Sequence, residues 1–332
     1  MKNRDMLTEI FSRTLLDDPM PFAGLDISRW PWDRVVWLAH HHLLAPRLYG
    51  LLKQSGEFEK VPPRAATSLS HGALEVAHSH VIHEALAPKL LSALEAYGLR
   101  AVVLKGFVLA RRYYARPEQR PFHDLDLLFP ATQRQAVESF FEGNGFRRSS
   151  GSYKFEANAH KVEFTSLANP ALVVECHFQL GYGKFALAGA CERAVSTKLS
   201  TSGSEAKVWH LAAEDEYLFL VFHAAIQHRF QKLGWLLDLA LIQRRKPFSV
   251  QHENFGAALA TTHYFLNHFA GLTGISAQPR NASLDRWFSR VADGSIEKSF
   301  IRKAGLRALT QGSWTSLLRY GAQRQWAMVR KP

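Results

Sequence analysis

The stretch Leu104–Phe129 constrains this chain most, because it joins a Lys-Gly turn at the end of one apolar run to an Asp-Leu-Asp pattern inside the next. Residues Val102–Leu104 predict a short buried strand. Gly106 permits a tight turn from this strand into a helix predicted over Phe107–Tyr114. A helix N-terminus presents free backbone N–H groups, and Lys105 adds a positive charge beside it. The turn therefore predicts a phosphate-binding site.

Asp124 and Asp126 interrupt the second apolar run, and residues two apart in a strand project from the same face. Two neighbouring carboxylates repel each other and resist burial, so they need a compensating cation. Magnesium fits, because it takes oxygen ligands from one or two carboxylates and from substrate phosphates. The alternative to a metal site is that Asp124 and Asp126 lie on the solvated side of an edge strand. The Lys-Gly turn upstream and Arg120 between the two features favour the metal site, which suits transfer of a phosphoryl or nucleotidyl group.

An acidic residue also lies on the predicted strand Leu172–Phe178, where a single acid is usually a surface residue. Its apolar residues alternate with Glu175 and His177, so these two side chains share the opposite face. Glu163, on the predicted strand Lys161–Thr165, follows the same alternation.

The rest of the chain predicts an α+β protein. Residues 5–98 have helical spacing, with a break at residues 61–63 and a glycine stop at residue 98. From residue 99 the runs become short and β-type, with a helix over residues 131–142, a strand over Ser152–Phe155 and a hairpin around residues 201–204. Helices then dominate. We expect a helical region at 1–98, an α/β core with a mixed sheet at 99–211, and a C-terminal helical domain at 212–332.

One group of histidines raises the question of a second metal site. His78, His80 and His83 lie with Glu84 on one predicted helix. No metalloprotease spacing is present, so a solvated or packed helix face is the favoured interpretation.

Further along the chain, His223 and His228 are five residues apart and are not expected on one helix face. Asp238 lies in an apolar helical stripe and needs a cation or a donor, for which His223 or Arg229 is the expected partner.

Composition narrows the class of protein. The 332-residue chain has a formal net charge of +12 and a pI of about 9.8, which favours a nucleotide, a nucleic acid or an anionic membrane surface as partner. Much of the basic excess lies beyond residue 286, where a solvated helix face is as good an explanation. Two cysteines exclude a disulfide framework and a cysteine-rich zinc site, and they fit a reducing cytoplasm. The charged N-terminus predicts no secretion signal. The longest apolar run, 217–226, is about half the length of a membrane span.

Four motifs together resemble the uncharacterised nucleotidyltransferase family within the polymerase-beta-like superfamily, over about residues 30–245. They are LKG at 104–106, RPFHDLDLL at 120–128, VECHFQL at 174–180, and HAAIQHRF at 223–230 with WLLDLA at 235–240. The resemblance implies a polymerase-beta-like core in which the Lys-Gly turn replaces the Gly-Ser turn common elsewhere in the superfamily. It implies that Asp124 and Asp126 are metal ligands and that Glu175 is the third carboxylate, for which Glu163 is the alternative.

Two functions follow from these predictions. In the first, Asp124, Asp126 and Glu175 hold Mg²⁺ or Mn²⁺ and carry out catalysis, with Glu175 as general base. The nucleotide is a nucleoside triphosphate such as ATP, and its predicted contacts are Lys105, Gly106, Arg120 and His177. A salt bridge to Asp124 or Asp126 is the alternative role for Lys105, and a salt bridge to Asp124 is the alternative for Arg120.

In the first function the enzyme moves a nucleoside monophosphate to an unidentified acceptor, which is a protein, peptide, sugar, small molecule or RNA. The second function is a catalytically inactive nucleotide-binding or regulatory module with the same fold. Nucleic-acid binding through the basic C-terminal helices ranks lowest, because no known motif or interleaved aromatic pattern supports it.

Overall fold

The computed structural model describes residues 3–15, 21–149, 160–201, 204–245, 249–272 and 279–295. It contains two compact units. The helical unit comprises Met1–Leu44, Leu51–Ala65 and Leu220–Pro332, and the sheet unit comprises Ala45–Gly50 and Ala66–Phe219. The division into 1–98, 99–211 and 212–332 stays a prediction.

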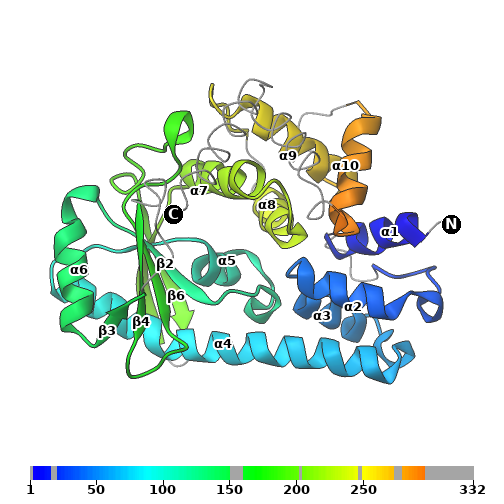
Figure 1. The fold of residues 1–332 in the computed structure, drawn as a ribbon, viewed down its shortest axis with the longest axis horizontal. Coiled ribbons are helices and arrows are strands. Elements are labelled where there is room, and N and C mark those ends of the chain that lie inside the picture. Colours follow the sequence, from blue (N-terminus) through cyan, green and yellow to red (C-terminus); the bar gives the residue numbers. More distant parts are fainter. Residues whose placement is uncertain are drawn as a thin grey trace, which may run out of the picture. The chain divides into compact units, whose positions relative to one another are not determined.

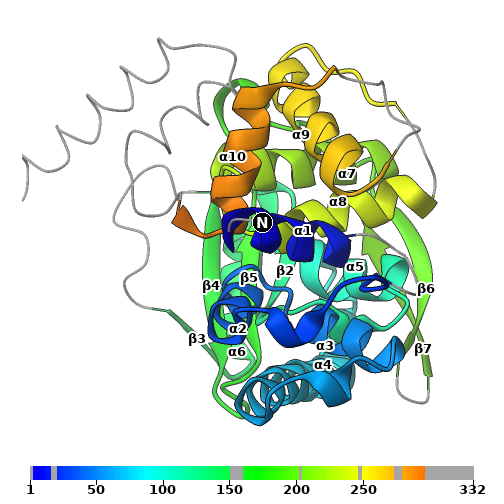
Figure 2. The same cartoon turned by 90° about the vertical axis from the view of Figure 1, so that its right-hand side faces the viewer.

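The helices account for most of the regular structure in the described residues. In chain order they are α1 (Asn3–Leu15), α2 (Trp32–His41), α3 (Ala45–Gln54), α4 (Pro63–Ala96), α5 (Lys105–Tyr113), α6 (Arg134–Gly143), α7 (Ala213–Val221), α8 (Leu233–Arg245), α9 (Gly256–Phe269) and α10 (Ala282–Ala292). Within the helical unit, α1 contacts α8, α9 and α10 (Figure 2). A stacked pair, Phe269 and Phe288 with ring centroids 3.7 Å apart, joins α9 to α10. No described helix is long and apolar enough to cross a membrane.

The sheet unit is built on one mixed sheet of seven strands in the order β3-β4-β5-β2-β1-β7-β6. These strands are β1 (Val102–Val103), β2 (Asp124–Leu128), β3 (Phe146–Arg148), β4 (Lys161–Ser166), β5 (Val173–His177), β6 (Val195–Thr201) and β7 (Ser204–His210). The neighbours β2 and β5 run parallel, as do β1 and β7, while the other pairs are antiparallel. The predicted α+β class with a mixed sheet is confirmed.

The two faces of this sheet differ in character. In Figure 1 the sheet is seen edge-on, with α6 on one side and α5 on the other. Phe141 of α6 stacks on Phe164 of β4 with ring centroids 4.7 Å apart, so α6 covers the apolar face. Strand alternation sends Asp126 and Glu175 to the opposite face, where the N-terminus of α5 lies.

Several predicted elements differ from the structure in detail. The expected strand Ser152–Phe155 lies outside the described residues, and the short edge strand β3 was not expected. The expected helix Phe107–Tyr114 begins two residues earlier, at Lys105.

The prediction that His223 and His228 do not share a helix face is wrong. Residues Phe222–Gln227 form a π-helix, whose wider turn brings positions five apart into line. The two imidazole centroids are 4.6 Å apart, and Trp235 lies 4.9 and 4.5 Å from them. The partner expected for Asp238 stays a prediction.

Candidate functional site

Lys105, and not Gly106, adopts the unusual backbone conformation in the turn that follows β1. Lys105 has a φ of +41°, in the left-handed region that a residue with a side chain adopts rarely. Gly106 has no positive φ, but a Cβ at that position would lie 2.7 Å from the Cβ of Phe122. The expected reason for this glycine, a permissive backbone in the turn, is therefore wrong. It is needed because α5 packs closely against Phe122.

The register of β2 and β5 brings carboxylates from distant parts of the chain together. Asp126 is the parallel partner of Glu175, and Leu128 is the partner of His177. One ligand atom each from Asp126, Glu175 and His177 lies within 4.8 Å of the other two, and all three residues are buried. We call these three residues the carboxylate–histidine cluster. Such a group is compatible with a divalent metal ion.

Three basic side chains contact this cluster. The Lys105 ammonium lies 2.8 Å from Oδ1 of Asp126, which realises the alternative role considered for this lysine. The same oxygen is 2.9 Å from Nε2 of His177, and that nitrogen is also 3.0 Å from Oε2 of Glu175. Lys161 forms an ion pair with the other carboxylate oxygen, Oε1 of Glu175. The negative charge of the cluster is therefore balanced inside the protein.

Burial and charge act in opposite directions on the cluster. Burial would lower the pKa of Lys105, but the carboxylates of Asp126, Asp124 and Glu175 outweigh it and raise the pKa above the ordinary value. Burial would likewise lower the pKa of His177, and hydrogen bonds to Asp126 and Glu175 raise it instead. For Glu175 burial favours the neutral form, but His177, Lys105 and Lys161 hold its pKa well below the usual range. The residues are thus held as paired charges.

Asp124 lies two residues before Asp126 on β2 and is more exposed. Repulsion from Asp126, followed by burial, raises its pKa to about 6, and Lys105 opposes that rise. An added cation would therefore favour the ionised form of Asp124.

Two other residues considered from the sequence lie nearby. Glu163 on β4 is directly opposite Glu175 across the antiparallel pair, so the alternative third carboxylate borders the same site. Arg120 is buried just before β2, and its guanidinium donates to the carbonyl of Pro121 at 3.5 Å. Its predicted contact with nucleotide stays a prediction.

Ion pairs fix the far end of α5. The Arg112 guanidinium lies 2.8 and 2.9 Å from the two carboxylate oxygens of Glu216, and the Tyr113 hydroxyl donates to Glu216 at 2.6 Å. Glu216 lies in the first turn of α7, where an acid is favoured by the helix dipole. These contacts hold α5 in place, so that its N-terminus stays beside the carboxylate–histidine cluster.

The histidines of α4 do not form a metal site with carboxylates in the described residues. His80 contacts the carbonyl of Arg120 through Nε2 at 3.0 Å, and His83 contacts the carbonyl of Ser79 through Nδ1 at 2.8 Å. Both rings pack edge-on against Phe122 with centroids 4.6 and 4.8 Å away. Burial lowers the pKa of His83, and it lowers that of His80 to about 4. The favoured interpretation of a packed helix face agrees with this geometry.

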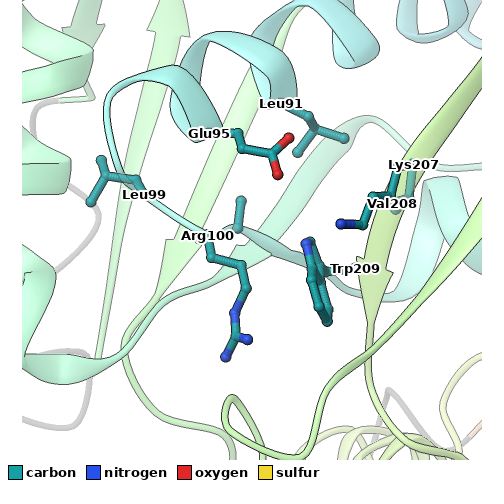
Figure 3. A pocket seen from close by; sticks show the side chains of 8 residues that line it. Leu91, Glu95, Leu99, Arg100, Lys207, Val208 and Trp209 are labelled. Carbon is teal, nitrogen blue, oxygen red and sulfur yellow. The ribbon is translucent and has the colours of Figure 1, made fainter.

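A small cavity lies elsewhere in the sheet unit, between the end of α4 and β7. It encloses about 20 Å³, which is room for a water molecule and far too little for a nucleotide. The indole of Trp209 lines this cavity and has two cations near it. The Arg100 guanidinium lies 4.8 Å and the Lys207 ammonium 4.9 Å from the ring. Figure 3 shows its lining residues, Leu91, Glu95, Leu99, Arg100, Ala101, Lys207, Val208 and Trp209.

Lys161 was missed as a member of the site by sequence reasoning. The signal was present, because alternation along β4 puts Lys161 on the same face as Glu163. What was absent was the strand order, since only the pairing of β4 with β5 places Lys161 opposite His177.

A mixed sheet that carries a buried Asp/Glu/His group beside a helix N-terminus brings possible metal ligands and a phosphate-binding element together. The chain belongs to the family described as "Uncharacterised nucleotidyltransferase", which matches residues 28–264. Membership implies a nucleotide substrate and supports transfer of a nucleoside monophosphate in general. A search of curated proteins gives no match.

Proposed function

We propose that this chain is a metal-dependent nucleotidyltransferase that moves a nucleoside monophosphate from a nucleoside triphosphate, such as ATP, to an acceptor. The observation that carries the proposal is the convergence of Asp126 and Glu175, with His177, beside the N-terminus of α5. Neither the helix N-terminus nor the acidic pair carries the proposal alone. A helix N-terminus attracts many anions, and paired acids occur on many strands, but together they bring phosphate and metal ligands to one place.

The residues present fit a divalent ion. Asp124, Asp126 and Glu175 would hold it, since carboxylates are the oxygen ligands that such ions take, and Asp126 and Glu175 already pair with the cations Lys105 and Lys161. When bound, the ion supplies positive charge that neutralises and orients the phosphates.

The protein's own groups do the remaining work by position and charge. The free N–H groups at the start of α5 bind the phosphates, and the Lys105 ammonium moves from Asp126 to the β- or γ-phosphate. An acceptor oxygen then attacks the α-phosphorus, the bond to the β-phosphate oxygen breaks, and pyrophosphate leaves. The acceptor proton goes to one of the site carboxylates as general base, and Asp124, whose pKa is raised to about 6, suits this better than Glu175. Arg120 serves as a further cation for the phosphates.

Two radioactive labels test the reaction type. The purified protein is incubated with a cell lysate, a divalent metal and a nucleoside triphosphate labelled on either the α- or the γ-phosphate. Nucleotidyl transfer puts the α-label on the acceptor and none of the γ-label, whereas phosphoryl transfer does the reverse. Asp124→Asn is the control, because it removes a carboxylate without removing one of the ion pairs of the cluster.

One observation favours the alternative of an inactive nucleotide-binding module. Asp126 and Glu175 are each already paired with a lysine, so the site is stable without a metal. Binding of triphosphate with no transfer of either label, tested against several lysates, would support this alternative over the enzyme.

A further inference from the structure

His177 occupies a position that the carboxylates alone do not explain. It is the last residue of β5, and its side chain is only 11% exposed. Its Nε2 atom is almost equidistant from carboxylate oxygens on two different strands, 2.9 Å from Asp126 and 3.0 Å from Glu175. A single imidazole nitrogen carries at most one hydrogen, so it makes at most one well-directed hydrogen bond. The second short contact therefore needs another reason.

Charge balance does not supply that reason. Lys105 already neutralises Asp126, and Lys161 already neutralises Glu175. A nitrogen that converges with two carboxylate oxygens is instead the arrangement needed when all three atoms bind one ion.

The spacing agrees with such an ion. In octahedral coordination with bonds of about 2.1 Å, adjacent ligand atoms are about 3.0 Å apart. The distances from Nε2 of His177 to the oxygens of Asp126 and Glu175 match that spacing, and the three ligand atoms lie within 4.8 Å of one another.

We propose that His177 is a direct ligand of the metal ion, so that the protein's donor set is mixed oxygen and nitrogen and selects Mn²⁺ over Mg²⁺. This rests on the proposed function, because it concerns the metal of the same site. Magnesium prefers oxygen ligands, whereas imidazole suits divalent transition metals. Mn²⁺ accepts both imidazole nitrogen and the carboxylate, water and phosphate oxygens expected around a nucleotide. The role predicted for His177 from the sequence, contact with the nucleotide, is replaced by contact with the ion.

Metal titration of the whole chain tests the proposal without any assay of activity. Free Mn²⁺ is measured by its electron paramagnetic resonance signal, with a non-hydrolysable triphosphate analogue present, and Mg²⁺ is then added as competitor. The comparison is between wild type and His177→Gln, whose amide oxygen reaches the place of Nε2. We expect Mn²⁺ to bind the wild type at least about tenfold more tightly than Mg²⁺. In the variant Mn²⁺ affinity falls by about tenfold or more and Mg²⁺ affinity is kept, so the preference disappears.

A second readout covers the case in which His177→Gln disturbs the fold. Pulsed electron paramagnetic resonance of the wild type detects a nitrogen bound directly to Mn²⁺. We expect that imidazole signal in the wild type and in the control His78→Gln, whose histidine is exposed on α4. Bound Mn²⁺ with no nitrogen coupling, or an unchanged preference in a folded His177→Gln, would overturn the proposal and leave the proposed function standing. Absence of Mn²⁺ binding to the wild type, with the analogue present, would overturn both.

Discussion

His177 on β5 and the pair His80 and His83 on α4 are all buried in the sheet unit, but in opposite surroundings. His177 faces two carboxylates, and their hydrogen bonds raise its pKa although burial acts against the charge. His80 and His83 on α4 face backbone carbonyls and the ring of Phe122, and burial lowers their pKa. Burial is thus common to both places. The difference lies in whether a carboxylate is within contact distance.

The partners of these histidines distinguish a metal-ligand site from packing in the core. From the sequence, the three histidines and one glutamate on α4 raise the question of a metal site, although a solvated or packed helix face is the favoured interpretation. The α4 histidines point their hydrogen-bonding atoms at carbonyls of Arg120 and Ser79, which already have fixed places in the chain. His177 points at carboxylate oxygens whose charge is balanced by the side chains of Lys105 and Lys161. A metal can replace a lysine, but it cannot replace a peptide group.

Asp126→Asn is expected to have the largest effect, because it removes the partner of Lys105 and of His177 together. The fold should lose about 3–5 kcal/mol of stability, since an unpaired buried charge remains. From the sequence alone, where only repulsion between Asp124 and Asp126 is visible, the same change is expected to preserve or increase stability. Urea unfolding distinguishes the two. Thermal melts with metal and triphosphate should also lose their ligand-induced shift.

The control for this change is Glu163→Gln on β4, which neutralises a carboxylate opposite Glu175 without breaking an ion pair of the cluster. It should keep most of the stability and of the ligand-induced shift. An unchanged shift in Asp126→Asn would rule out Asp126 as a ligand.

Lys105→Ala is expected to weaken triphosphate binding by about 2 kcal/mol, the size of one charge-assisted contact, and to weaken monophosphate binding less. The reason is that the ammonium contacts the β- or γ-phosphate after it leaves Asp126. Calorimetric titration of both nucleotides measures the ratio. Lys161→Ala, which removes the ion pair on Glu175, is the matched control and should leave that ratio unchanged. An equal loss for both nucleotides in Lys105→Ala would mean that this lysine serves the ion pair alone.

Gly106→Ala connects the two regions, because its new Cβ would meet Phe122, the residue on which His80 and His83 pack. The contact of 2.7 Å with the Cβ of Phe122 requires a shift, and overpacking of this kind costs about 1–3 kcal/mol. Chemical unfolding gives the loss directly. Gly143→Ala, at a site with nothing within 4 Å, is the control and should cost nothing measurable. Equal stabilities for the two variants would show that α5 does not depend on this close approach.

His80→Gln should have the smallest effect, visible only in the pH dependence of stability. The folded-state pKa of His80, about 4, lies below the unfolded value of 6.5, so between these values the unfolded chain binds more protons. Stability therefore falls as the pH falls from about 6.5 towards 4, by at most about 1.4 kcal/mol per pH unit for this group. Glutamine keeps a donor for the Arg120 carbonyl and removes the proton, so the fall should be shallower.

Urea unfolding at pH 7 and pH 5 measures that difference. The control is His78→Gln on the exposed side of α4, which should leave the slope as in the wild type. A slope unchanged in His80→Gln as well would mean that His80 is not held neutral by burial.

Local sequence patterns predicted much of this site. The rest depends on long-range pairing, which those patterns do not contain. The alternation within β2 and within β5 placed Asp124 with Asp126 and Glu175 with His177, because side-chain direction in a strand depends only on sequence parity. Family resemblance, rather than any local pattern, brought the two strands together. The role of Lys161 and the close packing of Gly106 on Phe122 depend on tertiary neighbours, which no local period encodes. The contact between His223 and His228 was missed because a π-helix has a different period from the α-helix assumed.

The most direct test of the account is a crystal structure with Mn²⁺ and a non-hydrolysable triphosphate analogue, in which anomalous scattering locates the metal. We expect an anomalous peak for an ion bound by Asp126, Glu175 and His177. The Lys105 ammonium should have moved from Asp126 to the β- or γ-phosphate at the start of α5. An analogue bound elsewhere, or one bound at α5 with no anomalous peak at these three residues and Lys105 still on Asp126, would contradict it.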